Sequence, residues 1–208
     1  MKITIFGATG SIGRLAVERA LKIGFEVIAF ARNPEKLEIT HHNLELYSGD
    51  VYEPVSVSDS VKNSDAVIIC LGSSKLSGDV RSKGTRNIVE AMKEHKIRRL
   101  ICQSTLGIGK SRENLNFYWK YFMFGFLLRN VYKDHEIQEK IVNQSNLDWT
   151  IVRPAAFIDN KPNSPVKTGF DENEKKLSLT IARQDVADFL LAQVTSTRHI
   201  NATPALSY

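Results

Sequence analysis

The sequence is poor in cysteine and lacks an apolar run long enough to cross a membrane. Its only two cysteines, Cys70 and Cys102, each stand near the end of an apolar run, and neither has the spacing of a metal ligand. We therefore expect two buried thiols and no metal site. Residues 1–6 already have the pattern of a strand, so we expect no signal peptide and a cytoplasmic protein.

A block of basic residues is also missing. The 28 Lys and Arg residues exceed the 23 Asp and Glu residues by five, but they are scattered along the chain. Nucleic acid is therefore not an expected partner, and a dinucleotide with several phosphates would account for part of the excess. With 208 residues, 42% of them hydrophobic, the chain has the size and composition of one globular domain, residues 1–208.

Short β-rich runs alternate with helical patterns along most of the chain. The expected strands are residues 2–6, 25–31, 44–48, 66–71, 99–103 and 149–153. Apolar spacings of three and four predict helices over residues 11–23, 55–62, 83–96 and 132–145, with a last helix over 183–194. This alternation predicts an α/β protein with a doubly wound parallel sheet, the Rossmann fold.

Two stretches interrupt the alternation. Residues 107–131 form an insertion with seven aromatic residues between Phe117 and Leu128, interrupted by Lys120 and too short to span a bilayer. It fits a helix on the core, a contact between two copies in a homodimer, or an active-site flap. Residues 154–182 predict loops on the substrate side, with a small hairpin among them.

A glycine-rich turn follows the first predicted strand and opens the first predicted helix. Gly7 permits the tight turn, Gly10 allows close backbone approach to a pyrophosphate, and Gly13 lets the helix pack near the strand. The start of the helix offers free amides and a partial positive charge to phosphates. The residues expected to bind the cofactor here are Gly7, Ala8, Thr9, Gly10, Ser11, Ile12 and Gly13.

The end of the second predicted strand indicates which nicotinamide cofactor binds. An NAD site usually has Asp or Glu there, whereas this chain has Arg32, with Lys36 one helical turn beyond. A guanidinium can pair with a 2′-phosphate, which a carboxylate would repel. The sequence therefore favours NADP(H) over NAD(H).

Two further segments follow predicted strands and extend the expected cofactor site. Asp50 and Val51 follow the third strand and would meet the adenine. The segment Leu71, Gly72 and Ser73 follows the fourth, and Gly72 would let the backbone pass close to a ribose. Open α/β sheets bind ligands at this edge.

With these residues identified, the chain resembles the atypical short-chain dehydrogenase/reductase superfamily. The similarity is to the branch that includes NmrA-like proteins and the NADPH-dependent flavin and biliverdin reductases. It extends over nearly the whole chain, through residues 7–10, 49–51, 65–68, 84–89, 135–136 with 139, 147–154 and 181–187. The resemblance implies the Rossmann fold and a nicotinamide cofactor, and it adds Pro154 to the expected cofactor site.

The chain departs from the superfamily at the catalytic pair. Most of these dehydrogenases use a Tyr with a Lys four residues later, and none of the six tyrosines here has that spacing. Tyr132 is followed by Glu136 instead. The resemblance places His135 near the usual Lys and Ser104 at the usual active-site Ser, so Ser104 and His135 are the candidate catalytic residues, with Ser104 also against the cofactor.

These residues lead to a primary hypothesis and two alternatives. The first is an NADPH-dependent reductase that transfers hydride to a flat acceptor such as a flavin or quinone, a monomer or homodimer with a small-molecule substrate. The second is a non-catalytic regulator of NmrA-like type that senses NADP(H) and binds a protein through residues 117–128. The third, a nucleotide-sugar epimerase, fits less well because only about 55 residues follow Pro154.

Overall fold

The protein is described from a computed structural model, which describes residues 1–73 and 76–208. Its main sheet has eight strands in the order β3-β2-β1-β4-β5-β6-β10-β8, all parallel except β8. In that order the strands are Leu44–Ser48, Glu26–Ala31, Lys2–Phe6, Ala66–Ile69, Arg99–Gln103, Asp148–Pro154, Ala205–Ser207 and Lys167–Thr168. The chain order reverses between β1 and β4, the point at which doubly wound sheets bind their ligands.

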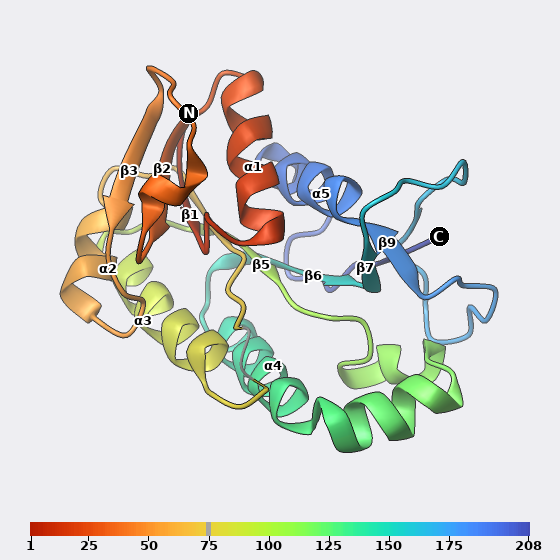
Figure 1. The fold of residues 1–208 in the computed structure, drawn as a ribbon. Helices are drawn as coiled ribbons and strands as arrows, with labels where there is room; N and C mark the ends of the chain where they lie inside the picture. Colours follow the sequence, from red (N-terminus) through yellow and green to blue (C-terminus); the bar gives the residue numbers. More distant parts are fainter. Residues whose placement is uncertain (74–75) are drawn as a thin grey trace.

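Helices cover both faces of the sheet (Figure 1). One face carries α1 (Ser11–Lys22) and α5 (Arg183–Thr195), and the other carries α2 (Pro54–Val61), α3 (Val80–Glu94) and α4 (Arg129–Asn143). The expected doubly wound Rossmann fold is therefore confirmed.

Strand β4 shows why both faces must be covered. Ala66 and Ile68 are buried in the apolar cluster under α1 and α5, whereas Val67 and Ile69 are buried in the opposite cluster. Side chains alternate between the faces of a strand, so a run that is apolar at every position needs a helix layer on each side. Cys70 and Cys102 are free and buried, one in each cluster, as predicted.

The six predicted strands and five predicted helices are all present within a few residues of their expected bounds. Gly24, just after the end of α1, has φ +84°. The amide of Gly24 donates to the carbonyl of Leu21 and that of Phe25 to the carbonyl of Ala20, so a left-handed glycine closes the helix with paired carbonyls.

The hairpin expected between residues 154 and 182 was wrong. Strand β7 (Ala156–Ile158) pairs in parallel with β9 (Thr180–Ala182), which a hairpin cannot do, and β8 joins the edge of the main sheet beside β10. These strands have two or three residues each, and their partners lie tens of residues away. Their pairing depends on tertiary contacts rather than on a local turn.

The aromatic insertion is helical. A short 3₁₀ segment, η2 (Gly109–Asn114), leads into the π-helix η3 (Tyr118–Leu127), which runs into α4. Phe124 is buried against the core, with Trp119 and Leu128 packed beside it. Within residues 1–73 and 76–208 no helix has the length and apolar character needed to cross a membrane.

Candidate functional site

A cleft of about 1180 Å³ lies along the carboxyl ends of the parallel strands and includes the point where the strand order reverses. This exceeds the roughly 300–1000 Å³ of ordinary small-molecule pockets. One end lies beside Arg32 after β2, and the other lies between Ser104 after β5 and His135 on α4. The cleft is therefore large enough for an extended ligand rather than a single ring.

The turn between β1 and α1 leaves no room for two of its glycines to carry a side chain. Gly7 has φ +78°, and a Cβ there would stand 2.4 Å from the carbonyl oxygen of Cys70, just after β4. A Cβ on Gly13 would stand 2.1 Å from the carbonyl oxygen of Gly7. The first turn of α1 is thereby held against the end of β1, as the glycine spacing predicts.

The start of α1 presents unpaired amides to this cleft. The N-cap residue is Gly10, which has no side chain to cap the helix. The first hydrogen bond of the helix runs from the amide of Arg14 to the carbonyl of Gly10. The amides of Ser11, Ile12 and Gly13 therefore have no partner within the helix. With the helix dipole behind them, they form a site for an anion such as a phosphate.

Most of the residues expected to bind the cofactor line this cleft. They are Gly7, Thr9, Gly10, Ser11, Ile12, Arg32, Asp50, Val51, Leu71, Gly72, Ser73, Ser104 and Pro154. Ala8 and Gly13 do not line it, because they are buried behind the turn and hold its shape.

Lys36 does not line the cleft, and its prediction as a cofactor contact is not supported by its position. It lies on a 3₁₀ turn, η1 (Pro34–Leu37), that buries Pro34 and Leu37 and leaves Lys36 exposed. The prediction assumed an α-helical continuation after Arg32. The chain instead turns away, with Glu38 in the left-handed region.

At the β2 end of the cleft, Arg32 has no ion-pair partner among the residues that the structure describes. The Asp50 carboxylate accepts a hydrogen bond from the amide of Tyr52 at 3.0 Å, which fixes the loop after β3. The Tyr52 hydroxyl donates to Asp79, just before α3, at 2.9 Å. Tyr52 was not predicted, because only the fold brings the loop after β3 to the start of α3.

Arg81, at the start of α3, lines the middle of the cleft and was also not predicted. Its guanidinium stands 3.6 Å from the Asp134 carboxylate, while its Nε is buried with no hydrogen-bond partner in the described part of the chain. Asp134 also accepts the backbone amides of Arg81 and Ser82. A buried cation with an unmatched donor can receive an anionic group of a ligand.

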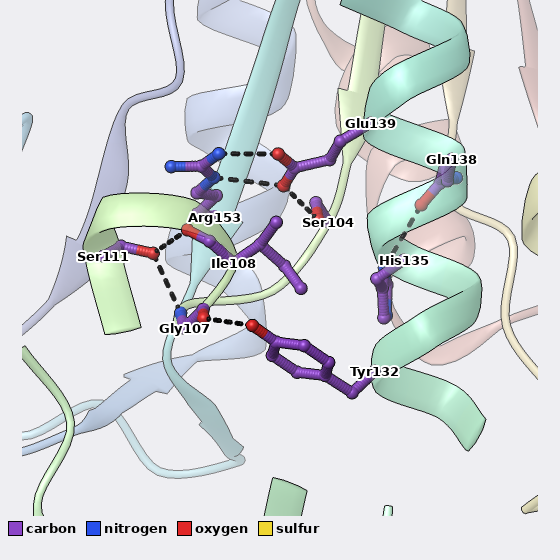
Figure 2. Close-up of polar contacts among 9 residues, drawn as sticks. All are labelled: Ser104, Gly107, Ile108, Ser111, Tyr132, His135, Gln138, Glu139 and Arg153. Atoms are coloured by element: carbon purple, nitrogen blue, oxygen red, sulfur yellow. Dashed lines mark hydrogen bonds and ion pairs between the residues drawn. The ribbon is translucent and has the colours of Figure 1, made fainter. Parts of the chain in front are cut away.

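At the far end, Ser104 belongs to a buried charged network (Figure 2). Its hydroxyl donates to Glu139 Oε1 at 2.6 Å, and Arg153 binds both oxygens of the same carboxylate at 3.0 and 2.6 Å. Ser104 follows β5, Glu139 lies on α4 and Arg153 lies on β6. Because the serine proton is given to Glu139, the Ser104 oxygen can face a ligand only as an acceptor.

His135 stands on the same face of α4 as Glu139 (Figure 2). Its Nδ1 lies 3.1 Å from Gln138 Oε1, and the amide nitrogen of Gln138 donates to Thr85. Gln138 thus uses its oxygen toward the imidazole, which places the His135 proton on Nδ1 and leaves Nε2 as an acceptor. Burial, and to a lesser degree the charge of Arg81, lowers the pKa of His135 to about 3, so the ring is neutral.

The remaining wall of this end comes from the insertion. Trp119, Phe124 and Leu128 line the cleft. The Tyr132 hydroxyl donates to the carbonyl of Gly107 at 3.0 Å and ties α4 to the start of the insertion (Figure 2). The residues of the expected flap therefore add an apolar wall to the end of the cleft that also holds Ser104 and His135.

Comparison with known proteins identifies the family. The profile of the family described as NAD(P)H-binding matches residues 7–197. The chain belongs to the NAD(P)H-binding family. It is 30% identical to the UPF0659 protein YMR090W of Saccharomyces cerevisiae over 217 residues, covering 98% of this chain and 89% of that protein.

Solved structures agree on the fold of this NAD(P)H-binding protein. A short-chain dehydrogenase/reductase of Veillonella parvula in complex with NADP has a TM-score of 0.81 at 19% identity, covering 100% of this chain and 94% of that one. The Escherichia coli protein ChuY, described as an anaerobilin reductase, has a TM-score of 0.79 at 21% identity, covering 99% and 96%. The predicted Rossmann fold is confirmed by these structures, and the family model confirms the expected nicotinamide cofactor.

The cleft fits the cofactor of the NAD(P)H-binding family. The free amides of α1 match a pyrophosphate, and the unmatched Nε of Arg81 lies further along the same cleft. Gln103 Oε1 is a buried acceptor with no partner in residues 1–73 and 76–208, and it lines the cleft beside Ser104. Such orphaned polar atoms are rare unless a ligand or water satisfies them.

Substituting alanine at two left-handed glycines tests the turn. Gly24→Ala should cost about 1 kcal/mol of unfolding free energy, because no atom lies within 4 Å of the added Cβ and only the backbone is strained. Gly7→Ala should cost at least about 3 kcal/mol and abolish cofactor binding, because the Cβ also meets Cys70. Urea unfolding and a cofactor titration measure both effects. Equal costs for the two variants would contradict the packing described here.

The neutral His135 predicts a loss of stability in acid. Below pH 6.5 the unfolded chain takes up a proton on this residue, whereas the folded protein does so only near pH 3. Stability should therefore fall as the pH is lowered between these values. Between pH 7.5 and pH 5 the wild type should lose about 2 kcal/mol more than His135→Asn, which keeps a donor and an acceptor but does not titrate.

Urea unfolding at both pH values measures this difference. His42→Asn, in an exposed loop, is the matched control and should behave as the wild type does. If His135→Asn loses as much stability in acid as the wild type, His135 is not held neutral by its surroundings.

Proposed function

We propose that the protein is an NADPH-dependent reductase that transfers hydride to a flat acceptor such as a flavin or a quinone. The observation that carries the proposal is the hydrogen bonding at the Ser104 end of the cleft, where Ser104, His135 and Tyr132, among the residues that the structure describes, each have their proton engaged. When bound, the nicotinamide supplies the hydride. The chain's own residues decide which acceptors can use it.

Each candidate proton donor at this end is already engaged. The Ser104 proton is held by Glu139, the single proton of His135 is held by Gln138, and the Tyr132 hydroxyl is held by Gly107. Reduction of an aldehyde or ketone needs a proton at the carbonyl oxygen in the transition state, and the superfamily's Tyr and Lys pair normally supplies it. A flavin or quinone spreads the new charge over its ring and can take its proton from water.

The walls of the cleft support a planar acceptor. Trp119, Phe124 and Leu128 line the same cleft as Ser104 and His135 and offer an apolar surface on which a ring can lie flat. Orientation of the ring and exclusion of water would then supply most of the rate. The reductase name of ChuY, whose fold matches this one, adds support for hydride transfer to a conjugated ring system.

The preference for NADPH rests on Arg32. Its guanidinium lines the β2 end of the cleft with no carboxylate paired to it among the described residues, so it is free to meet a 2′-phosphate. We predict that Arg32→Glu weakens NADPH binding at least about tenfold more than NADH binding, since a charge-assisted hydrogen bond is worth about 1.5–3 kcal/mol. Fluorescence titration with both cofactors measures the ratio. Lys36→Glu, outside the cleft, should leave the ratio nearly unchanged, and equal losses for Arg32→Glu would refute the preference.

Steady-state oxidation of NADPH with flavin mononucleotide, a soluble quinone and an aliphatic aldehyde tests the activity. Turnover should occur with the first two acceptors. It should be at least about a hundredfold slower with the aldehyde, because a general acid typically accelerates such a reaction by at least that factor and none is positioned here by the described residues. Ser104→Ala should lower kcat with every acceptor, whereas Ser58→Ala, on the remote helix α2, should not.

Two results would contradict the proposal. One is tight NADPH binding with no turnover against a broad panel of flavins and quinones, which would favour the non-catalytic regulator. The other is efficient aldehyde reduction, which would mean that a proton donor enters the site.

A further inference from the structure

The π-helix η3 exposes large apolar side chains that the fold does not use. Its exposed side and flanks carry six of them, which we call the outer aromatic face: Phe117, Tyr118, Tyr121, Phe122, Phe126 and Leu127. Their exposed fractions run from 44% for Leu127 to 78% for Phe117 and Phe126. In Figure 1 this helix, drawn in green, forms the lower edge of the molecule and continues into α4.

The other side of the same helix makes the contacts with the core of the protein. Trp119, Phe124 and Leu128 pack on the core and line the cleft. On the outer aromatic face, the ring centroids of Phe117 and Tyr121 lie 4.8 Å apart with the rings tilted, and those of Tyr118 and Phe122 lie 5.4 Å apart with the rings stacked. These rings contact one another along the helix and remain open to solvent. Contiguous apolar patches of this kind mark binding surfaces rather than folding cores.

Basic side chains outnumber acidic ones in the segment that carries this face, residues 107–133. Residues 107–133 contain five basic side chains, Lys110, Arg112, Lys120, Arg129 and Lys133, and one acidic side chain, Glu113, which pairs with Lys120. Arg129 and Lys133 are exposed on the first turns of α4. Neither has an ion-pair partner within the part of the chain that the structure describes. The apolar face thus ends in two free cations.

We propose that the outer aromatic face docks the protein on an anionic lipid surface. Exposed Phe and Leu side chains would enter the interface, the Tyr hydroxyls would remain at the level of the headgroups, and Arg129 and Lys133 would meet lipid phosphates. The helix has ten residues and would lie in the plane of the surface rather than cross it. This inference is independent of the proposed reductase activity.

A second copy of the chain fits this face less well. A two-fold contact would bring the same surface of two copies together, and the one acidic side chain of residues 107–133, Glu113, already pairs with Lys120, so this segment would offer Arg129 and Lys133 no negative partner. An anionic lipid surface complements both the apolar side chains and the two cations. Because the inner side of η3 lines the cleft, docking would bring the cleft within about one helix diameter, roughly 10 Å, of the lipid.

Flotation of the full-length protein with lipid vesicles tests this proposal. One set of vesicles contains phosphatidylglycerol and phosphatidylcholine, and the other contains phosphatidylcholine alone. The wild type should float with the anionic vesicles, and high salt should weaken the binding. The triple variant Phe117→Ser, Phe122→Ser, Phe126→Ser should lose at least about tenfold in affinity, as should the double variant Arg129→Glu, Lys133→Glu.

Matched variants control for general effects of polarity and charge. Val55→Ser removes an exposed apolar residue from α2, and Lys93→Glu with Lys96→Glu reverses two exposed charges at the end of α3. Both should bind vesicles as the wild type does. All variants should keep the wild-type circular dichroism and NADPH affinity, because none of the substituted residues lines the cleft.

Three outcomes would overturn the proposal. The wild type could fail to float with anionic vesicles, or the triple and double variants could bind them as well as the wild type does. The third outcome is a wild-type dimer in light scattering that the triple variant converts to a monomer, without vesicle binding. That result would make the face a contact between copies.

Discussion

The close approach of Gly13 to the backbone of Gly7 is the constraint on which the rest of the site depends. Because a Cβ at Gly13 would stand 2.1 Å from the Gly7 carbonyl oxygen, only hydrogen allows α1 to begin directly at the end of β1. Gly7 is held in turn against the carbonyl of Cys70, just after β4. These contacts fix the free amides of the first helical turn at the place where the strand order reverses, and the cleft extends from them in both directions.

The two ends of the cleft differ in what they offer a ligand. The β2 end and the middle carry cations, Arg32 and Arg81, of which Arg81 has a buried donor that no described group satisfies. The opposite end carries the oxygen of Ser104 and the Nε2 of neutral His135, both of them acceptors. A dinucleotide with its phosphates toward the cations and its carboxamide toward the acceptors would satisfy both ends. At that end, the protons of Ser104, His135 and Tyr132 are all engaged in hydrogen bonds with other described residues.

Much of this arrangement could be predicted from the sequence, and the part that could not has a common cause. The runs of β1, β2, β4, β5 and β6 are buried on both faces, and the glycine spacing of the first turn reflects a contact between residues close in the sequence, so both can be predicted from a single chain. The hydrogen bond from Ser104 to Glu139 could not be predicted in this way, because Glu139 and its partner Arg153 come from α4 and β6. Arg81 and Tyr52 likewise become site residues only when α3 meets the loop after β3, and the short strands β7 to β10 have no periodic signal of their own.

The central claim is that the backbone amides at the start of α1 bind the pyrophosphate of a nicotinamide cofactor. Titration of isotope-labelled protein with NADPH, followed by the ¹⁵N–¹H resonances of Ser11 and Ile12, which line the cleft, tests this binding. We expect both resonances to shift together, saturate at one cofactor per chain, and move more than the amides of the remote helix α2. Saturable binding that leaves both resonances in place, or the absence of binding, would contradict it.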